Sequence, residues 1–527
     1  MFQSPYPRID IPDASIYDDL FGSLDDADLD RVALIDSATG AETTYGGLRA
    51  QVDAFAGALA TRGVDTDTVV ALLCPNVPAF ATAFHGILRL GAIVTTINSL
   101  YTAHEIENQL RDAAATWLVT VSPLLGPAVE AARAVGISDE RVIVLDGAEG
   151  HPDLRTLLSE GRTPPEVTFD PSTHIAVLPY SSGTTGNPKG VMLTHRNLVA
   201  NVHQCRVVIE LDRDDRVLAV LPFFHIYGMT VLLNLALRQR ACLVTMPRFD
   251  LADFLRSVQD HRCSFLFIAP PIAVALAKHP MVDQFDLSSV RTVFSGAAPL
   301  DGETAETAAR RLDARILQGY GMSELSPVSH AVPTDRTDMP ASSVGVLVPN
   351  VDAKLVDAET GAEIDAHGDD GLTVPGEIWV RGPNVMLGYL NRPDATDETL
   401  DADGFLHTGD IGVHHVSGYF AIVDRLKELI KYKGYQIAPA ELEALLLSHP
   451  RIMDAAVIGV DDDDKQEIPK AFVVAAADSG LTAEEVMAFV AAEVAPHKKV
   501  RRVEFIDAIP KSASGKILRK DLRSRER

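Results

Sequence analysis

The sequence predicts an α/β protein of two domains: a large N-terminal domain of layered α/β subdomains with a small β-barrel subdomain, and a mobile α+β C-terminal domain. Three observations predict this fold. The chain has 527 residues, well above the roughly 150 residues of a typical domain. Strand and helix patterns alternate from residue 45 to about residue 317, and strands then follow one another over 344–424. A short mixed pattern fills the remainder of the chain.

The alternating region begins with two helical patterns and two strand patterns. Tyr45–Arg62 and Ala79–Leu90 have apolar residues at helical spacing, whereas Val69–Leu73 and Ile93–Thr96 are short β-rich runs. Because strands that alternate with helices form parallel sheets, we expect a parallel sheet covered on both faces. The other elements expected here are the helices His104–Ala114 and Asn197–Gln204 and the strands Trp117–Val121, Arg141–Leu145, Ile175–Leu178, Arg216–Leu221, Cys242–Met246, Ser264–Ile268 and Thr292–Ser295.

The pattern changes at about residue 344. The runs VGVLV, AKLVD, GEIWVRG and FAIVD are separated by Gly, Asp and Pro turns with no helix between them, which predicts an antiparallel β subdomain over 344–424. We expect the N-terminal domain to span 1–424, the C-terminal domain 425–527, and a hinge to lie at Asp424–Arg425. The C-terminal elements expected are the helices Pro439–Ser448 and Ala483–Val494 and strands near Ala455–Val460 and Ala471–Ala476.

Composition narrows the class of protein. Lys+Arg 47 against Asp+Glu 73 gives 47 − 73 = −26, a charge that disfavours nucleic-acid and anionic-membrane partners. The four cysteines are far apart without a CxxC pair, which excludes a disulfide scaffold and a thiolate zinc site. The first residues lack a signal-peptide pattern, and no apolar run reaches the roughly 20 residues of a spanning helix. We therefore expect a cytoplasmic protein whose partners are small molecules.

The segment Tyr180–Val191, YSSGTTGNPKGV, carries the strongest chemical signal. Its consecutive small residues and three glycines leave backbone N–H groups free to surround an anion, and Lys189 adds a positive charge. It is not a Walker A loop, which requires GxxxxGK[ST]. Because a predicted strand precedes the segment and a predicted helix follows it, a phosphate-binding loop is favoured over a flexible linker.

Seven further segments follow this loop along the chain: PFFHIYG (222–228), SGAAPL (295–300), QGYGMSE (318–324), GEIWVRG (376–382), TGD (408–410), DRLKELIKYKGYQIAPAELE (424–443) and PKSASGKILRK (510–520). Together the eight motifs resemble the adenylate-forming enzyme superfamily. Within it, the chain is most similar to the acyl-CoA synthetase branch that contains bacterial 4-coumarate–CoA ligases. The resemblance covers nearly the whole chain.

This resemblance implies an acid–thiol ligase that works in two steps. A carboxylate attacks the α-phosphate of ATP, which gives an acyl adenylate and pyrophosphate. The C-terminal domain then rotates, and the thiol of coenzyme A displaces AMP to form a thioester. Mg²⁺ is the implied cofactor, because charge neutralisation and positioning dominate phosphoryl chemistry.

The resemblance also assigns the nucleotide contacts. The loop residues bind the β- and γ-phosphates, one carboxylate binds Mg²⁺, one carboxylate and one arginine bind the ribose, and a C-terminal lysine approaches the α-phosphate during adenylation. Ser323 stands where many relatives carry Thr as the α-phosphate donor. The residues so matched are Ser181, Ser182, Gly183, Thr184, Thr185 and Lys189 (phosphates), Gln318, Gly319 and Tyr320 (adenine), Ser323, Glu324 (Mg²⁺), Asp410 and Arg425 (ribose), and Lys516.

Residues near the hinge match a second group of positions. Lys427 lies at the hinge, Lys431 resembles an AMP contact, and Gln436 resembles a further catalytic position. The coenzyme A contacts used after rotation are matched by Arg248, Lys433 and Gly434. Lys516 also lies in a PxxxxGK segment like those that lysine acetyltransferases recognise in some bacterial relatives, so such an enzyme is a further expected partner.

The implied acyl pocket is apolar. Its expected lining is His225, Tyr227, Gly228, Val231, Phe294, Ala297, Gly319, Pro327 and Val328. Small and apolar side chains suit an apolar aromatic or aliphatic acid, and a cinnamate- or 4-coumarate-type acid is the expected substrate. Some plant hydroxycinnamate ligases have a lysine in place of Phe294, and its absence weakens the case for preferring 4-coumarate over cinnamate. His225 is expected to position the substrate, with a core histidine as the alternative.

Other functions remain open. A medium- or long-chain fatty acyl-CoA synthetase would share all these motifs, and a fatty acyl-AMP ligase would pass the adenylate to a carrier protein. A luciferase-type oxygenase shares the motifs as well. Amino-acid activation is disfavoured because the segment 222–228 lacks an aspartate for the substrate ammonium. A non-enzymatic binding module would be expected to have lost Lys516 or Glu324.

Overall fold

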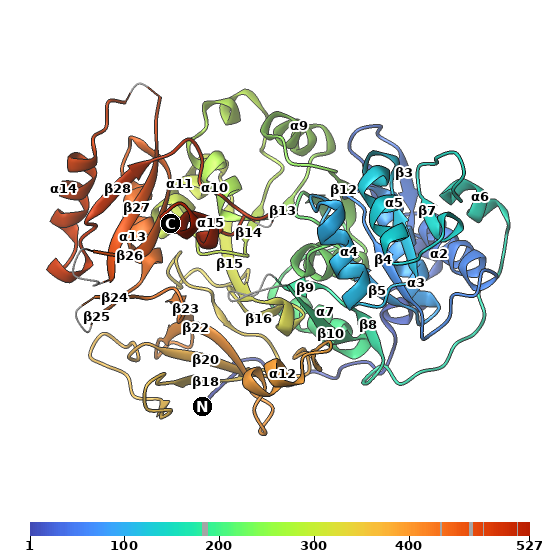
Figure 1. Ribbon diagram of the computed structural model, residues 1–527, viewed down its shortest axis with the longest axis horizontal. Coiled ribbons are helices and arrows are strands. Elements are labelled where there is room, and N and C mark those ends of the chain that lie inside the picture. Colours follow the sequence, from blue (N-terminus) through green and yellow to red (C-terminus); the bar gives the residue numbers. More distant parts are fainter. Residues whose placement is uncertain (182–187, 433–434, 463–466, 478, 514, 527) are drawn as a thin grey trace.

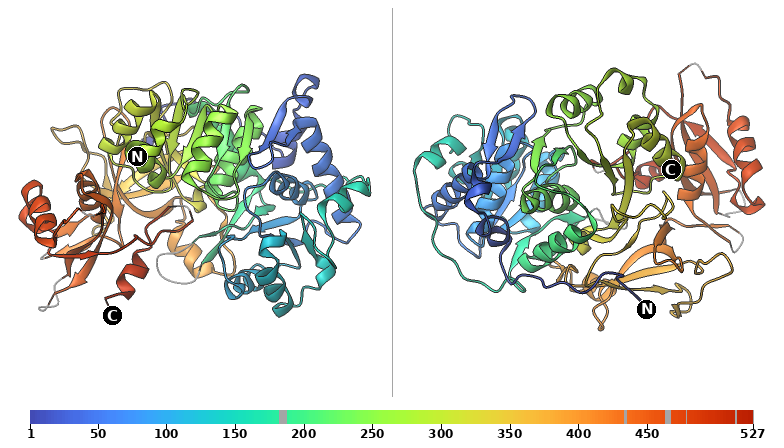
Figure 2. Two further views of the ribbon diagram at one scale, coloured as in Figure 1. Left: turned by 90° about the horizontal axis from the view of Figure 1, so that it is seen from above. Right: turned by 180° about the vertical axis from the view of Figure 1, so that it is seen from behind.

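The computed structural model describes residues 1–527 except 182–187, 433–434, 463–466, 478, 514 and 527. The molecule contains two α/β sheets, an antiparallel β unit and a C-terminal α+β unit (Figure 1). In Figure 2 the C-terminal unit, coloured orange to red, lies at one end of the molecule, and the first α/β unit, coloured blue to cyan, lies at the other. The predicted class, mixed α/β with a separate C-terminal unit, is confirmed.

The first sheet has eight strands in the order β21-β10-β8-β5-β4-β6-β7, with β9 paired to β10. Successive residues of β4 and the residue after it enter different hydrophobic clusters: Val70 and Leu72 belong to the cluster of Phe55, whereas Ala71 and the following Leu73 belong to the cluster of Ile106. Helices therefore cover both faces, as predicted. The elements are α2 (Tyr45–Ala60), β4 (Val69–Leu72), α3 (Pro78–Arg89), β5 (Ile93–Thr96), α4 (Ala103–Asp112), β6 (Trp117–Thr120), α5 (Leu125–Ala134), β7 (Val142–Val144), α6 (Leu154–Ser159), β8 (Ile175–Val177), β9 (Tyr180–Ser181) and β10 (Lys189–Thr194).

The second sheet has nine strands in the order β17-β16-β15-β14-β13-β11-β12-β2-β3. Six of them, β2 and β11 to β15, run parallel. The alternating pattern thus builds two sheets. The elements are α1 (Asp26–Leu29), β2 (Val32–Asp36), β3 (Glu42–Thr44), α7 (His195–Val208), β11 (Arg216–Ala219), the π-helix η4 (Tyr227–Asn234), α8 (Leu235–Gln239), β12 (Cys242–Thr245), α9 (Leu251–His261), β13 (Phe265–Ile268), α10 (Pro270–Lys278), β14 (Thr292–Ser295), α11 (Gly302–Leu312), β15 (Arg315–Gly321), η6 (Ser323–Leu325), β16 (Val328–Ala331) and β17 (Val346–Leu347).

The β unit differs from its prediction in two respects, an added strand and an added helix. The N-terminal strand β1 (Phe2–Gln3) adds to the edge of the β unit, where it pairs with Ala353 and Asp352 of β18. The pairing order places β1 and β23 at the two ends of the sheet, and the rings of Phe2 and Phe420 bring these two strands to a centroid distance of 5.6 Å, so the sheet curls back on itself. A helix, α12 (Pro393–Thr399), interrupts the strand region, with Pro393 in its first turn. The other strands of this unit are β18 (Asp352–Val356), β19 (Glu363–Ile364), β20 (Gly376–Arg381), β22 (Leu406–His414) and β23 (Phe420–Arg425), whereas β21 (Gly388–Tyr389) pairs with β10 of the first sheet.

The C-terminal unit has hydrophobic cores of its own. Ala455 and Val457 of β26 enter one cluster with α13 and α14, whereas Ala456 and Ile458 enter another with Leu522. The main core is drawn instead from residues 2–422. The predicted helices and strands are present, and β24, β25, β28 and α15 are additional. The elements are β24 (Ile430–Tyr432), β25 (Tyr435–Ile437), α13 (Pro439–Ser448), β26 (Ile452–Asp461), β27 (Glu467–Ala475), α14 (Ala483–Glu493), β28 (Arg502–Phe505) and α15 (Arg519–Ser524).

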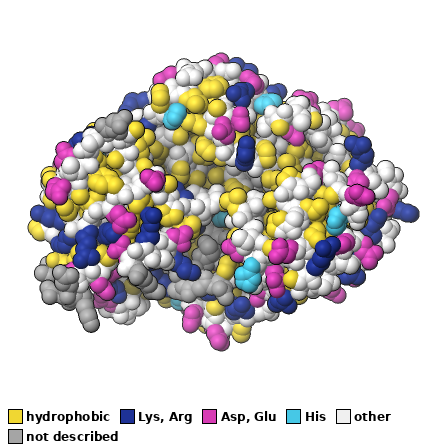
Figure 3. Space-filling view, turned by 45° about the horizontal axis from the view of Figure 1, so that its top comes forward, with side chains coloured by type: hydrophobic (Ala, Val, Ile, Leu, Met, Phe, Trp, Pro, Cys, Tyr) yellow, Lys and Arg dark blue, Asp and Glu magenta, His cyan; other side chains and the backbone are white. Residues whose placement is uncertain are grey.

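Within the described part of the chain, none of the helices combines the length and apolar character needed to cross a bilayer. The face shown in Figure 3 is hollowed near its middle.

Candidate active site

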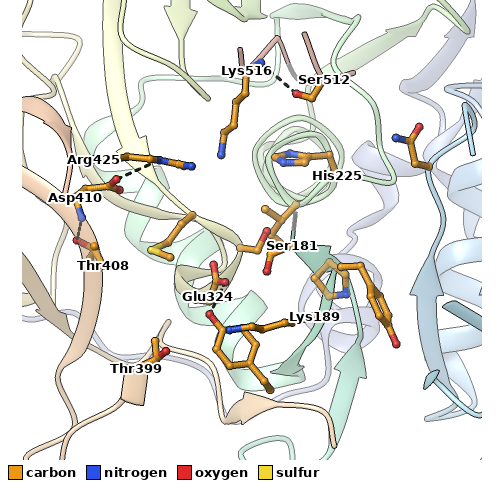
Figure 4. Close-up of a pocket in the computed structure, with 18 of the residues that line it drawn as sticks. Ser181, Lys189, His225, Glu324, Thr399, Thr408, Asp410, Arg425, Ser512 and Lys516 are labelled. Atoms are coloured by element: carbon orange, nitrogen blue, oxygen red, sulfur yellow. Dashed lines mark hydrogen bonds and ion pairs between the residues drawn. The ribbon is translucent and has the colours of Figure 1, made fainter. Parts of the chain in front are cut away.

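A cavity of about 520 Å³ lies where the two α/β sheets, the β unit and the C-terminal unit meet. The carboxyl ends of β5 and β8 open onto it, which is the usual position of ligand sites in open α/β sheets. Nine residues singled out in the sequence line it: Ser181, Lys189, His225, Ser323, Glu324, Asp410, Arg425, Lys427 and Lys516. Figure 4 shows Glu324 and His225 on the N-terminal body and Lys516 on the C-terminal unit around the same space.

A second, mainly apolar cavity of about 40 Å³ adjoins the first. His225, Met322, Ser323 and Lys516 line both cavities. The site therefore joins a polar chamber to a small apolar one at a junction that carries a histidine and a lysine. The predicted acyl-pocket residues that line the apolar cavity are His225, Tyr227, Phe294, Ala297, Gly319, Pro327 and Val328.

Asp410 is held by strand pairing and by a phenol. It faces Arg425 across the antiparallel strands β22 and β23, with Arg425 Nε 3.4 Å from its Oδ1. The hydroxyl of Tyr320 donates to Asp410 Oδ2 at 2.6 Å. Burial, reinforced by the Asp410 charge, raises the pKa of Tyr320 well above its usual value, so the phenol remains a donor at neutral pH. The carboxylate is thereby fixed on the cavity wall, where it can accept hydrogen bonds from a ligand's hydroxyl groups.

Glu324 is buried, at 4% exposure, and is held through Tyr389. The Tyr389 hydroxyl donates to Glu324 Oε1 at 2.8 Å, and Lys189 Nζ lies 4.6 Å from the centre of the same ring. Strand β21 positions Tyr389 because it pairs with β10, Val191 lying opposite Tyr389. The phenol of Tyr389 therefore contacts both the Lys189 ammonium of the phosphate loop and the buried Glu324 carboxylate.

The described residues contain no cluster of three or more His, Cys, Asp or Glu side chains that could enclose a metal ion. Mg²⁺ in nucleotide sites usually binds one or two carboxylates together with phosphates and water. Glu324, a single carboxylate beside the loop lysine, fits that kind of site.

A backbone hydrogen bond determines which ring nitrogen of His225 carries the proton. His225 Nδ1 accepts a hydrogen bond from the backbone N–H of Tyr227 at 3.3 Å, so the neutral ring carries its proton on Nε2. Burial, and then the charge of Lys516, lowers the pKa of His225 to about 3. The ring is therefore a neutral donor at physiological pH. Because it lines both cavities, it is not a core histidine.

Lys516 enters the cavity from the C-terminal unit. Its backbone N–H donates to Ser512 Oγ at 3.1 Å, and its carbonyl accepts from Ser512 N at 2.8 Å. Gly515 has φ +84°, and a Cβ there would lie 3.1 Å from the Cβ of Ala269, so the loop packs closely on the N-terminal body. Burial first, and Arg425 second, lower the pKa of Lys516 to about 8, against the effect of Asp410 and Glu324. Figure 4 shows its side chain reaching between Arg425 and His225.

This arrangement can bind a polyanion and an apolar acyl group side by side. A model of the AMP-binding enzyme family matches residues 25–390, and a model of the AMP-binding enzyme C-terminal domain matches residues 441–516. The chain belongs to the AMP-binding enzyme family.

Relatives of this AMP-binding enzyme include named acid–CoA ligases. A protein of Oryza sativa subsp. japonica named 4-coumarate–CoA ligase 5 is 43% identical over 536 aligned residues, with 100% of this chain and 97% of that protein covered. A Solanum tuberosum protein named 4-coumarate–CoA ligase 1 is 41% identical, with 100% and 96% covered. The solved structure of the anthranilate CoA ligase AuaEII with anthranoyl-AMP has a TM-score of 0.89 at 26% identity, with 98% of each chain covered. ATP-bound MatB from Rhodopseudomonas palustris has a TM-score of 0.87 at 29% identity, with 98% and 99% covered.

Several residues expected at the site of this AMP-binding enzyme line neither cavity. Gln318 is 3% exposed and lines neither cavity. Its carboxamide bonds the backbone of Leu300 in both directions and the Ala341 carbonyl, so it holds the surrounding loops. Val231 is fully buried in η4 and also lines neither cavity. A Cβ on Gly228 would clash with the Pro222 carbonyl, which makes this glycine a packing position.

The positions assigned to coenzyme A and to the second step are outside both cavities or outside the described residues. Arg248 and Lys431 are exposed and line neither cavity. Gln436 lies in β25, opposite Lys431. Ser182, Gly183, Thr184, Thr185, Lys433 and Gly434 lie outside the described residues. Their assignments stay predictions.

Sequence reasoning missed part of the wall. Tyr389 lies in a two-residue strand, and its proximity to Glu324 follows only from pairing between β21 and β10. The first sheet also contributes polar side chains that no motif indicated, because their strand ends meet the site only after folding. The lining residues missed are Thr96, Asn98, Tyr101, Gln109, Met322, Glu377, Tyr389, Glu398, Thr399, His407, Thr408, Ser512 and Ala513, among others.

Proposed function

We propose that this AMP-binding enzyme is an ATP-dependent carboxylic acid–CoA ligase. It forms an acyl adenylate with release of pyrophosphate, and then an acyl-CoA thioester with release of AMP. The observation that carries the proposal is the junction at which His225 and Lys516 line both a polar and an apolar cavity. An acyl phosphate anhydride needs such a junction, because its two halves differ in polarity. The named relatives support the same reaction class.

In the first step, the chain's residues bind and orient the reactants. Asp410 accepts hydrogen bonds from the ribose hydroxyls, and Ser323 donates to the α-phosphate. The ammonium of Lys516 neutralises the charge that develops as the carboxylate oxygen attacks phosphorus and pyrophosphate departs. Lys189 and Ser181 hold the β- and γ-phosphates. The binding of both reactants in adjoining cavities converts a bimolecular reaction into a positioned one.

Mg²⁺ is the proposed cofactor, held by Glu324. When bound, Mg²⁺ shares the neutralisation of phosphate charge. The buried carboxylate is oriented by Tyr389, whose hydroxyl hydrogen bond leaves the other carboxylate oxygen for a cation.

The acid is oriented by His225. Its Nε2–H can donate to a carboxylate oxygen, since Nδ1 is engaged by the Tyr227 backbone. The acyl group then extends into the apolar cavity between Phe294 and Val328. The apolar lining of this chamber supports an aryl acid of the cinnamate or 4-coumarate type, and Phe294 leaves a ring hydroxyl without a charged partner. A medium- or long-chain fatty acid is the alternative substrate.

The second step requires a different orientation of the C-terminal unit. We place the N-terminal domain at 1–424 and the mobile domain at 425–527, supported by the separate hydrophobic clusters on the two sides of this boundary. The hinge at Asp424–Arg425 coincides with the end of β23. Arg248, Lys433 and Gly434 are the proposed coenzyme A contacts, and Lys431 and Gln436 act with AMP in the catalytic region.

The test is mass-spectrometric detection of acyl-CoA from the purified chain with ATP, Mg²⁺ and coenzyme A. The acids are cinnamate, 4-coumarate, ferulate, benzoate, octanoate and palmitate. We expect thioesters from the phenylpropenoic acids, with cinnamate accepted at least as well as 4-coumarate. Thioesters from aliphatic acids alone would move the enzyme to the fatty-acid class. Accumulation of acyl adenylate without thioester would favour a ligase that serves a carrier protein, and the absence of both products would overturn the proposal.

A further inference from the structure

We propose that Asn76 and Thr96 are positioning residues for His225. Asn76 lies in the loop that follows β4 and Thr96 is the last residue of β5, both in the first sheet unit. Both residues bond to the loop of the second sheet that carries this histidine. The inference rests on the proposed function, in which His225 orients the acid.

Asn76 uses its whole carboxamide on one loop. It is 3% exposed, and its Nδ2 donates to the carbonyls of Ala219 and Leu221 at 2.9 and 2.8 Å. Its Oδ1 accepts from the backbone N–H of Phe223 at 2.8 Å. An amide side chain offers two donor hydrogens and one acceptor oxygen, so these three bonds engage each of its polar groups. The three contacts lie within the six residues that precede His225.

Thr96 holds the same loop one residue closer to His225. Its hydroxyl donates to the Phe224 carbonyl at 2.6 Å, and it is 4% exposed. The end of β5 is fixed in turn, because Gln109 Nε2 donates to the Thr96 carbonyl at 2.9 Å. The ring of Phe223 packs against Phe80 at a centroid distance of 5.3 Å. The loop is thus bonded and packed against the first sheet immediately before His225.

The loop depends on these contacts because it has left the second sheet. β11 ends at Ala219, and Pro222 has no N–H to donate. Leu221 and Phe223 are buried, so loss of the Asn76 carboxamide would deprive a buried carbonyl and a buried N–H of this hydrogen bond. On the far side, Gly228 packs directly on the Pro222 carbonyl. The backbone around His225 is therefore held on one side by Asn76 and Thr96 of the first sheet unit and on the other by the packing of Gly228.

This connection links the two halves of the site. β4 and β5 belong to the sheet that also contains β8 and β10, the strands on either side of the phosphate loop. Asn76 and Thr96 therefore fix His225 relative to the element that holds the phosphates. Because misplacement by about 1 Å can cost roughly a hundredfold in rate, a clamp of this kind affects the reaction as well as the fold.

The experiment is a double-mutant cycle on the full chain, with an accepted acid and with acyl adenylate formation as the readout. Asn76→Asp keeps the shape and the acceptor and removes both donors. We expect kcat/KM for the acid to fall by roughly tenfold or more, with KM for ATP changed less than about twofold. In a His225→Ala background the same substitution should cost less than about twofold, because nothing remains to be positioned.

Thr96→Val is the second variant, in case Asn76→Asp does not fold. It removes one hydrogen bond, and we expect a loss of roughly fivefold that again vanishes without His225. The matched control is Asn350→Asp, since Asn350 bonds both backbone groups of Ile9 away from the site. It should change neither background, and melting curves verify folding of each variant.

Equal losses with and without His225, for whichever variant folds, would overturn the positioning role while leaving the proposed function intact. A wild-type chain that forms no acyl adenylate from any acid of the panel would overturn both. Non-additive losses confined to the acid are the expected result.

Discussion

The two sides of the cavity are built differently. On the N-terminal side, Asp410, Glu324 and His225 are each held by a hydrogen bond to a neighbouring group, and the elements that carry them share one large core. On the C-terminal side, Lys516 lies on a loop whose backbone bonds to Ser512 of the same loop. That loop belongs to a unit with hydrophobic clusters of its own.

This difference assigns the binding of nucleotide and acid to the N-terminal side and the supply of the Lys516 charge to the C-terminal side. A wall that is already organised binds nucleotide and acid without further ordering, so binding energy is not spent on arranging it. A cation on a separately folded unit can be supplied for one step and withdrawn for the next. Among the described residues, the contacts between the two sides are few in kind: Lys278 Nζ donates to the Leu447 carbonyl at 2.8 Å in an exposed position, and Ile411 packs with Leu429 and Ala438 in a small apolar cluster. Exposed polar contacts contribute little to stability.

Removal of the Lys516 ammonium group should have the largest effect on the rate of acyl adenylate formation. Lys516→Ala should lower the rate of acyl adenylate formation by about 10²- to 10³-fold, as for loss of a charge-stabilising group. Thioester formation from preformed acyl adenylate should persist, because that step uses another orientation of the domain. Pyrophosphate release and single-turnover thioester formation measure the two steps. Lys520→Ala, at an exposed position in the same segment, is the control, and equal impairment of both steps would contradict the division of roles.

On the fixed wall, the largest effect is expected at Asp410. Asp410→Asn retains an acceptor for Tyr320 but removes the charge that strengthens hydrogen bonds to the ribose. A charged hydrogen bond contributes roughly 1.5–3 kcal/mol, so kcat/KM for ATP should fall about 10- to 100-fold while KM for the acid changes little. Initial rates at varied ATP give the answer. Asp403→Asn, exposed in the same β unit, is the control; a larger effect on the acid than on ATP would place Asp410 elsewhere in the reaction.

The pH dependence of adenylation should report on Lys516 of the C-terminal unit. Because burial lowers the pKa of Lys516 to about 8, the free enzyme loses this positive charge as pH rises through that value. We expect kcat/KM for adenylation to fall about tenfold between pH 8 and 9.5, since a neutral amine cannot stabilise the transition state. Lys516→Arg remains charged and should move this fall to higher pH. An unchanged profile in Lys516→Arg would assign the titration to another group.

The smallest effect is expected at Tyr389, which acts on the proposed Mg²⁺ site only through Glu324. Tyr389→Phe keeps the ring that faces Lys189 and removes the hydroxyl bonded to Glu324. Loss of one hydrogen bond, about 1 kcal/mol, should raise the Mg²⁺ concentration needed for half-maximal rate roughly fivefold. Mg²⁺ titrations of the adenylation rate provide the measurement. Tyr419→Phe, whose ring stacks on His415 in the β unit, serves as the control. Equal Mg²⁺ requirements in wild type and Tyr389→Phe would remove Tyr389 from this role.

Much of the fold could be predicted because local patterns decide it. The bounds of β5, β14 and α13 agree with the predicted ranges, since buried β-rich runs and an amphipathic helix are bounded by turn residues. Elements that depend on a partner were missed. β1 has two residues and exists only through pairing with β18, and the residues of β21 are ordered by pairing with β10. Such short segments have no periodicity of their own.

The sequence by itself determined the chemical groups and their order along the chain: the glycine-rich loop, the carboxylates, the histidine and the C-terminal lysine. It also determined which segments form buried strands, because side-chain period and turn residues are local properties. Only the tertiary structure decided which groups meet. Asn76 contacts a loop about 145 positions away in the chain, and Lys516 shares its cavities with His225. These contacts depend on how sheets and domains pack, and packing is a cooperative property of the whole core.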